Sequence, residues 1–89
     1  MNLTNKPVET VTKFDLSGNM IPLRIRFDNE DHTRITADIY NIVSTKSNNF
    51  AGINTIDYVC LLELDQKEHM IELRYHVPDH KWVLRNVIY

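Results

Sequence analysis

The last third of this chain alternates between apolar and other residues with a period of two, over residues 70–77 and again over residues 82–89. Turn-forming residues, Pro78-Asp79-His80-Lys81, separate the two stretches. Successive side chains of a strand point to opposite faces, so the pattern predicts two paired strands with one buried face. The chain is therefore expected to build a sheet, and this segment contains no catalytic or cofactor motif.

The composition predicts one compact domain. The chain has 89 residues, of which 43% are hydrophobic. That is enough for a single core, but not for a core with a deep ligand pocket. We expect residues 8–89 to form the domain and the polar residues 1–7 to be a disordered tail. The net charge of -2 gives no general attraction to nucleic acid or to an anionic membrane.

Three features predict a cytoplasmic protein. The single cysteine, Cys60, excludes an internal disulfide and is expected in the core. The N-terminal residues lack the apolar stretch of a secretion signal. The longest apolar run, residues 58–62, is far shorter than a membrane span, so no membrane partner is expected.

The whole chain is expected to be all-β, a six-stranded antiparallel meander curled into a small barrel or half-barrel. The predicted strands cover residues 8–14, 20–28, a stretch from residue 32 through Ile39, 53–65, 69–77 and 82–89. The residues expected to face inward from the second strand are Ile21, Leu23, Ile25 and Phe27. The register that keeps apolar residues together pairs Ile25 with Ile35, Leu62 with Ile71 and Val77 with Trp82.

Two structures stay open for the middle of the chain. Ile35, Ala37 and Ile39 alternate as in a strand, whereas Ile35, Ile39, Ile42 and Val43 fit the spacing of a helix. The β-branched content favours the strand, with a short helix over residues 36–46 as the alternative. The polar stretch 44–52 that follows is expected to be a loop.

The second face of the C-terminal strands is expected to need a cover. It carries apolar side chains among charged ones, namely Val59, Leu61, Met70, Val83, Val87 and Tyr89. The first half of the chain would cover them in a closed barrel. Otherwise another subunit would cover them, which makes this set a candidate interface.

No set of residues predicts catalysis, a metal or a cofactor. The four histidines, His32, His69, His76 and His80, are expected at the surface or in turns, because structural zinc requires clustered Cys and His ligands. The carboxylates of Asp28, Glu30 and Asp31 fall in one turn, as is usual for solvated turns. We therefore expect a protein that is not an enzyme.

Three arginines, Arg24, Arg26 and Arg34, are expected on one face of neighbouring strands, with Arg26 opposite Arg34. Guanidinium groups match the geometry of phosphate and carboxylate, so the cluster is a candidate anion site. The alternative is that Asp38, Asp28 and Glu30 neutralise the arginines on a solvated face.

Five short segments are similar to segments of a known family: Pro22-Leu23-Arg24-Ile25-Arg26-Phe27, Ala51-Gly52, Tyr58-x-Cys60, Glu72-Leu73-Arg74-Tyr75 and Lys81-Trp82-x-Leu84. Together they resemble small uncharacterised β-rich bacterial proteins, found mostly in Gram-positive anaerobes. The resemblance covers most of residues 20–84. It implies no activity and therefore no role for any residue. The turn at residues 65–68 lacks the glycine of the family pattern.

The sequence thus predicts a non-catalytic β module that self-associates or binds a protein partner, in part because its final strand has an unprotected edge. The alternative is weak binding of single-stranded nucleic acid or an anion through Arg24, Arg26 and Arg34.

Overall fold

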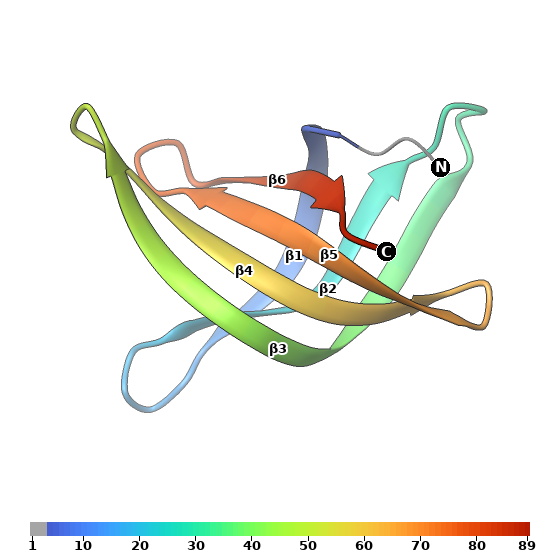
Figure 1. Ribbon diagram of the computed structural model, residues 1–89, viewed down its shortest axis with the longest axis horizontal. Coiled ribbons are helices and arrows are strands. Elements are labelled where there is room, and N and C mark those ends of the chain that lie inside the picture. The colour runs from blue at the N-terminus through green and yellow to red at the C-terminus, as the bar shows by residue number, and fades with distance from the viewer. Residues whose placement is uncertain (1–3) are drawn as a thin grey trace.

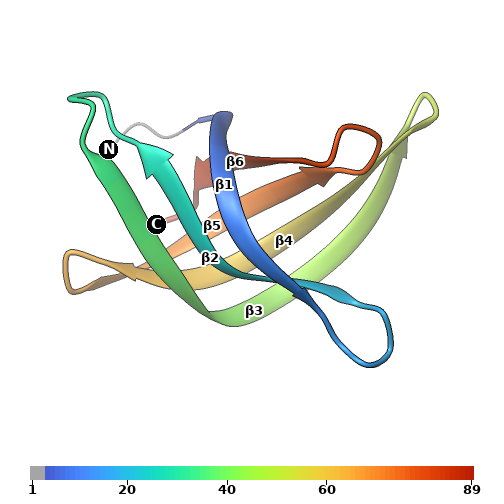
Figure 2. The ribbon, with the colours of Figure 1, turned by 180° about the vertical axis from the view of Figure 1, so that it is seen from behind.

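The computed structural model describes residues 4–89, which form one closed barrel of six antiparallel strands in sequence order, with no helix among them (Figures 1 and 2). The strands are β1 (Lys6–Phe14), β2 (Met20–Asp28), β3 (Arg34–Phe50), β4 (Ile53–Leu64), β5 (Lys67–His76) and β6 (Lys81–Val87). The predicted fold class is confirmed, and the helix alternative for residues 36–46 is wrong.

The core fills the inside of the barrel with alternate side chains from five strands. Its buried hydrophobic members are Ile25, Phe27, Ala37, Tyr58, Cys60, Leu62, Ile71, Leu73, Trp82 and Leu84. Every second residue of β4, from Tyr58 to Leu62, is inside, as the period of two requires. Cys60 is completely buried, as predicted.

Two hairpins have two-residue turns in which both residues have positive φ. These are Ala51 and Gly52 between β3 and β4, and Asp65 and Gln66 between β4 and β5. Such turns match the right-handed twist of the strands. The second turn was expected one residue later, so Ile71 pairs with Cys60 and not with Leu62.

Two other predicted pairings are also shifted by two residues. Ile25 pairs with Ala37 rather than Ile35, and Trp82 pairs with Tyr75 rather than Val77. A shift of two residues leaves each side chain on the same face of the sheet. Ile25, Ala37 and Trp82 therefore face the core as predicted, although their partners change.

A bulge in β2 changes which residues face the core. Val11 pairs with Arg24 while Thr12 pairs with Pro22, so Leu23 is an extra residue without a partner on β1. Pro22 is consequently buried and Leu23 is exposed, which contradicts the inward position predicted for Leu23.

The strand β3 is 17 residues long and includes residues 44–50, which were expected to be a loop. Two register shifts leave Tyr40 and Val43 as extra residues on β3. The first shift is the reason that Ile39 and Ile42, three residues apart, both pack against the core. Their helix-like spacing is therefore the result of a bulge.

A further shift near the C-terminus moves Val87 to the inside. Leu73 pairs with Leu84 and Glu72 with Asn86, so Arg85 is the extra residue. Val87 is then opposite Ile71 and packs against the core. The prediction that Val87 lies on the outer face is wrong.

The barrel closes where β1 meets β6. The pairing joins Lys6 to Leu84 and Val8 to Trp82, and the backbone N–H of Asn5 donates to the carbonyl of Arg85 at 3.1 Å. The strand therefore begins within the predicted tail 1–7, whose residues 1–3 lie outside the described residues.

The closure is limited to one end of the barrel. Beyond Val8, β1 separates from β6, and β2 pairs with β3 only over residues 34–38 of β3. The β1–β2 hairpin consequently projects away from the other strands, at the same end as the tips of the β3–β4 and β5–β6 hairpins (Figure 1).

Candidate binding surfaces

The three candidate arginines lie on the outside of the barrel, and each is bonded to a carboxylate. Arg24 bonds Asp38 at 2.5 Å, Arg26 bonds Glu9 at 2.5 Å and Arg34 bonds Asp28 at 3.2 Å. Neutralisation by Asp38 and Asp28 matches the alternative drawn from the sequence, and Glu9 takes the place of Glu30.

The observed register explains this pairing. Arg34 is opposite Asp28, whereas the predicted register placed it opposite Arg26. The hydrogen bond and the positive charge of Arg26 hold the pKa of Glu9 below its usual range. The three guanidinium groups therefore already have anionic partners, and the cluster presents no excess positive charge.

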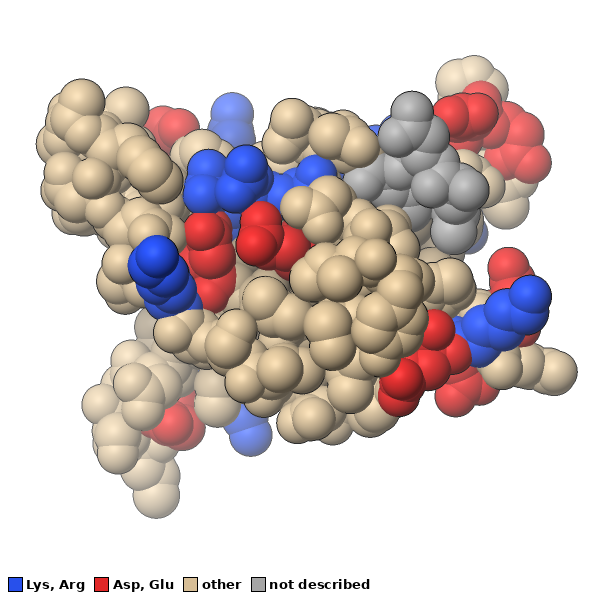
Figure 3. Space-filling model, viewed as in Figure 1, with Lys and Arg blue, Asp and Glu red and all other residues tan. Residues whose placement is uncertain are grey.

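The candidate apolar interface lies on the outer face of β4, β5 and β6. Leu61 pairs with Met70, Val59 with Glu72 and Val83 with Arg74, and all four apolar side chains are half-buried. In Figure 3 uncharged surface occupies the middle of the view, with charged groups toward its margins.

Two bulged residues of β3 enlarge this surface. Tyr40 and Val43 are 55% and 49% exposed. The sequence did not place them in the candidate interface, because their outward positions depend on bulges that an alternating pattern does not reveal. We refer to Tyr40, Val43, Val59, Leu61 and Met70 as the outer apolar patch.

Ion pairs border one end of the outer apolar patch. Arg74 holds Asp57 through two bonds, at 2.7 and 2.9 Å, and Arg85 bonds Glu72 at 3.1 Å. The guanidinium of Arg74 also lies 5.1 Å from the ring centre of Phe50, a cation–π contact. Because the Asp57–Arg74 pair is only 15–17% exposed, it is well shielded from solvent.

Two carboxylates border the opposite end of the patch. Glu63 is directly opposite Glu68, and like charges in this arrangement repel. The hydroxyls of Tyr40 and Tyr89 both donate to Glu68, which lowers the pKa of Glu68. The same bond, with partial desolvation, raises the pKa of Tyr40 to about 12.

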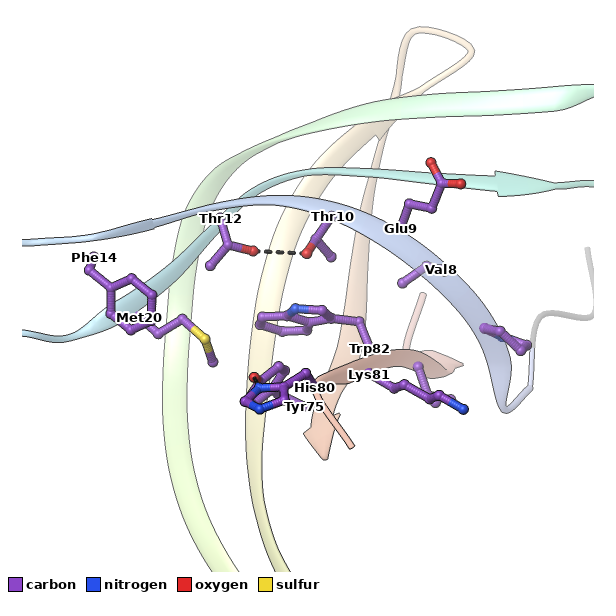
Figure 4. Close-up of a pocket in the computed structure, with 12 residues that line it drawn as sticks. Val8, Glu9, Thr10, Thr12, Phe14, Met20, Tyr75, His80, Lys81 and Trp82 are labelled. Carbon is purple, nitrogen blue, oxygen red and sulfur yellow. Dashed lines mark hydrogen bonds between the residues drawn. The ribbon is translucent and has the colours of Figure 1, made fainter. Parts of the chain in front are cut away.

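A cleft of about 930 Å³ opens where β1 separates from the β5–β6 hairpin. We call it the mouth cleft. Figure 4 shows Thr10 and Thr12 of β1 on one side and Tyr75 and His80 on the other. Trp82, 8% exposed, forms part of the lining between them.

The aromatic rings of the mouth cleft form a continuous series. The ring centre of Tyr75 lies 5.0 Å from that of Trp82 and 6.3 Å from that of His80, and Tyr58 lies 5.4 Å from Trp82. The hydroxyl of Tyr75 and Nδ1 of His80 are 2.7 Å apart. The mouth cleft thus combines apolar rings with a few fixed polar atoms, as small ligand sites do.

A second cleft, of about 680 Å³, is lined by the β1–β2 hairpin and its turn and by residues of β3, β4 and β5, among them Ile42 and Ile56. Phe14, Met20 and Tyr75 line both clefts. The hydroxyl of Tyr58 donates to the carbonyl of Met20 at 2.7 Å, which connects β4 to the hairpin next to its turn.

The titratable groups do not form a metal centre within residues 4–89. No group of three or more His, Cys, Asp or Glu residues is placed to hold a metal ion in that part of the chain. His76 is opposite Thr55, and Asp57 is bonded by Arg74. Burial raises the pKa of Cys60 to about 12, so its thiol stays protonated at neutral pH.

The fold and its surfaces define a small antiparallel β-barrel with an outer apolar patch and an aromatic mouth cleft. Compared with known proteins, the chain matches no family model, no curated protein and no solved structure. Residues 4–89 include no helix of the length and hydropathy required to cross a membrane.

Proposed function

We propose that the protein is a non-catalytic binding module that associates with a second copy of itself through the outer apolar patch. The observation that carries the proposal is the row of Val59, Leu61 and Met70, widened by the exposed Tyr40 and Val43. An apolar centre with charged groups at its border is the usual anatomy of a protein interface.

The charges at the two ends of the patch favour a second copy as the partner. Lys46, opposite Asp57, is at one end of the face, and Glu63 is at the other. Neither forms an ion pair among the residues that the structure describes. A two-fold axis across the strands would place the Glu63 end of one copy on the Lys46 end of the other.

Light scattering on a size-exclusion column, over micromolar concentrations, tests the proposal. We expect a concentration-dependent dimer that Leu61→Lys abolishes, because the substitution puts a charge at the centre of the interface. The control is Leu16→Lys, which adds the same charge at an exposed tip of the β1–β2 hairpin and should leave the dimer intact.

Charge reversal tests the two-fold arrangement itself. Lys46→Glu and Glu63→Lys should each weaken the dimer, and the double variant should restore it. A monomer at every concentration would refute self-association. A dimer that tolerates Leu61→Lys would refute the choice of surface.

The nucleic-acid alternative has less support, since the guanidinium groups of Arg24, Arg26 and Arg34 each bond a carboxylate. Its distinguishing signature is binding of a labelled oligonucleotide that falls steeply with salt. A cytoplasmic location belongs to the same proposal, supported by a single cysteine that is buried and unpaired.

A further inference from the structure

We propose that the open edge of β1 accepts an extended peptide from a partner protein, which adds as an antiparallel strand and places an apolar side chain in the mouth cleft. This site is separate from the outer apolar patch, so it does not depend on the self-association proposed above. The open edge comprises Thr10 to Phe14.

The open edge exists because β6 begins at Lys81. The β1–β6 register ends at Val8 opposite Trp82. Its continuation would place Thr10 opposite His80, but there the chain turns away into the β5–β6 turn. In the described part of the chain, β1 beyond Val8 consequently pairs with β2 alone.

Two prolines indicate which backbone groups face the open edge. Pro7 has no N–H and is opposite Val83, so the β1–β6 bonds use its neighbours, Lys6 and Val8. Pro22 likewise cannot bond Thr12, its partner on β2. Because backbone groups alternate along a strand, Thr10 and Thr12 direct their N–H and C=O groups away from β2, toward the open edge.

This edge has less protection than the free edge of β3. The edge of β3 beyond Asp38 is also without β2, but it has two bulges and Lys46. Bulges and lysines are the usual devices that prevent strand addition. The open edge of β1 has no extra residue of its own and a single lysine, Lys13.

The mouth cleft provides room for side chains of the added strand. Side chains of Thr10 and Thr12 line this cleft, with their hydroxyls 2.8 Å apart. A strand beside them would direct alternate side chains to the same face, toward Tyr75 and His80. The cleft volume, about 930 Å³, falls within the range of about 300–1,000 Å³ that is common for binding pockets.

The position of Lys81 favours one direction and one charge for the peptide. An antiparallel strand on β1 runs in the direction of β6, so its C-terminal end would approach Lys81, the first residue of β6. Lys81 lines the mouth cleft and forms no ion pair among residues 4–89. We therefore expect a carboxylate at the C-terminal end of the bound segment, either a chain terminus or an acidic side chain.

Fluorescence provides a direct test, because Trp82, the only tryptophan, lines the cleft. The probe is a synthetic peptide, acetyl-Thr-Phe-Thr-Phe-Thr-Val, with a free C-terminal carboxylate. We expect a saturable change in Trp82 emission. N-methylation of the backbone positions facing β1 should weaken binding at least about tenfold, whereas N-methylation of the alternate positions should have little effect.

Variants of the protein provide matched controls. Thr12→Pro removes an N–H from the open edge and should abolish binding. The variant should still fold, since proline is tolerated at edge strands. Thr12→Val keeps the N–H and should bind. Lys81→Gln should weaken binding of the free acid and leave the amidated peptide unaffected.

Several results would overturn the inference. Equal binding of both N-methylated peptides would mean capture by the apolar cleft without strand pairing. Binding of a single-stranded oligonucleotide, but not of the peptide, would assign the cleft to stacking of bases. No binding of the peptide by a correctly folded protein would also refute it. Leu61→Lys, which addresses self-association, should leave peptide binding unchanged, so the two proposals fail separately.

Discussion

The turn between β4 and β5 yields a prediction with a defined magnitude. Asp65 and Gln66 have φ of 51° and 63° and connect the paired residues Leu64 and Lys67. Turns of this kind favour Asp-Gly or Asn-Gly, because both central residues must adopt positive φ. Aspartate tolerates that conformation, but glutamine has no local hydrogen bond that compensates for it.

We expect Gln66→Gly to stabilise the protein. A left-handed conformation costs an L-residue about 1–2 kcal/mol, and glycine removes this cost from the folded state. Glycine also gives the unfolded chain more entropy, which offsets about 0.5–1 kcal/mol of the stabilisation. The net gain is about 0.5–1 kcal/mol, which corresponds to a rise in Tm of about 2–8 °C for a domain of this size.

Thermal unfolding followed by circular dichroism, together with urea titration, measures the effect. The control is Lys67→Gly, which places glycine at the first residue of β5 and should destabilise by about 0.5–1 kcal/mol. If Gln66→Gly lowered Tm as Lys67→Gly does, the positive φ at Gln66 would not be a source of strain, and the reasoning would be wrong.

Three further predictions follow from individual residues. Ala51→Asn, at φ 51° before Gly52, should raise Tm by creating the Asn-Gly pair preferred in such turns. Arg74 lowers the pKa of Asp57 in the folded protein below its ordinary value of 3.8. The stability due to this pair is therefore present above pH 3.8 and is lost as the pH falls through the pKa of the folded state. In urea titrations, Asp57→Asn should reduce the loss of stability between neutral and acidic pH. Cys60, with its pKa raised to about 12, should react with a thiol reagent at neutral pH only after unfolding, as absorbance with and without denaturant would show.

The inner faces of the sheet could be predicted because they depend on a period of two. Ile71 and Leu73 are buried as expected, although both of their neighbouring strands are shifted from the predicted register. Away from the bulges the errors were even numbers of residues, and such errors preserve the face of each side chain. The hydrophobic pattern therefore determined the faces, and turn conformation determined the partners.

The bulges could not be predicted, and they account for most of the remaining differences. An extra residue at Leu23 reverses the alternation in β2, and one at Arg85 reverses it in β6. In the sequence, such a reversal of the apolar alternation resembles the end of a strand or the spacing of a helix. Whether a strand accommodates it as a bulge depends on partners that are distant in the chain.

The surfaces were predicted in part, for the same reason. Asp38 and Asp28 were available as partners for Arg24 and Arg34 from the adjacent strand. Glu9, the partner of Arg26, is 17 residues away on β1 and becomes a neighbour only through the β1–β2 register. The mouth cleft could not be predicted, because no local pattern in the sequence shows where β1 and β6 separate.

β1 and β6 pair only along a short seam, from Lys6 to Val8 of β1. The shortness of this seam explains why the barrel is closed at one end and open at the other. Without that seam, β1 and β6 would both be free edges along their whole length, which favours aggregation. The seam at Lys6 to Val8 closes one end, where the core residues Ile25 and Leu62 are completely buried. At the other end the early turn before Lys81 leaves Phe14 72% exposed and opens the mouth cleft. The closed end therefore completes the hydrogen bonding of the sheet, whereas the open end presents the unpaired backbone groups and exposed rings on which the proposed strand addition depends.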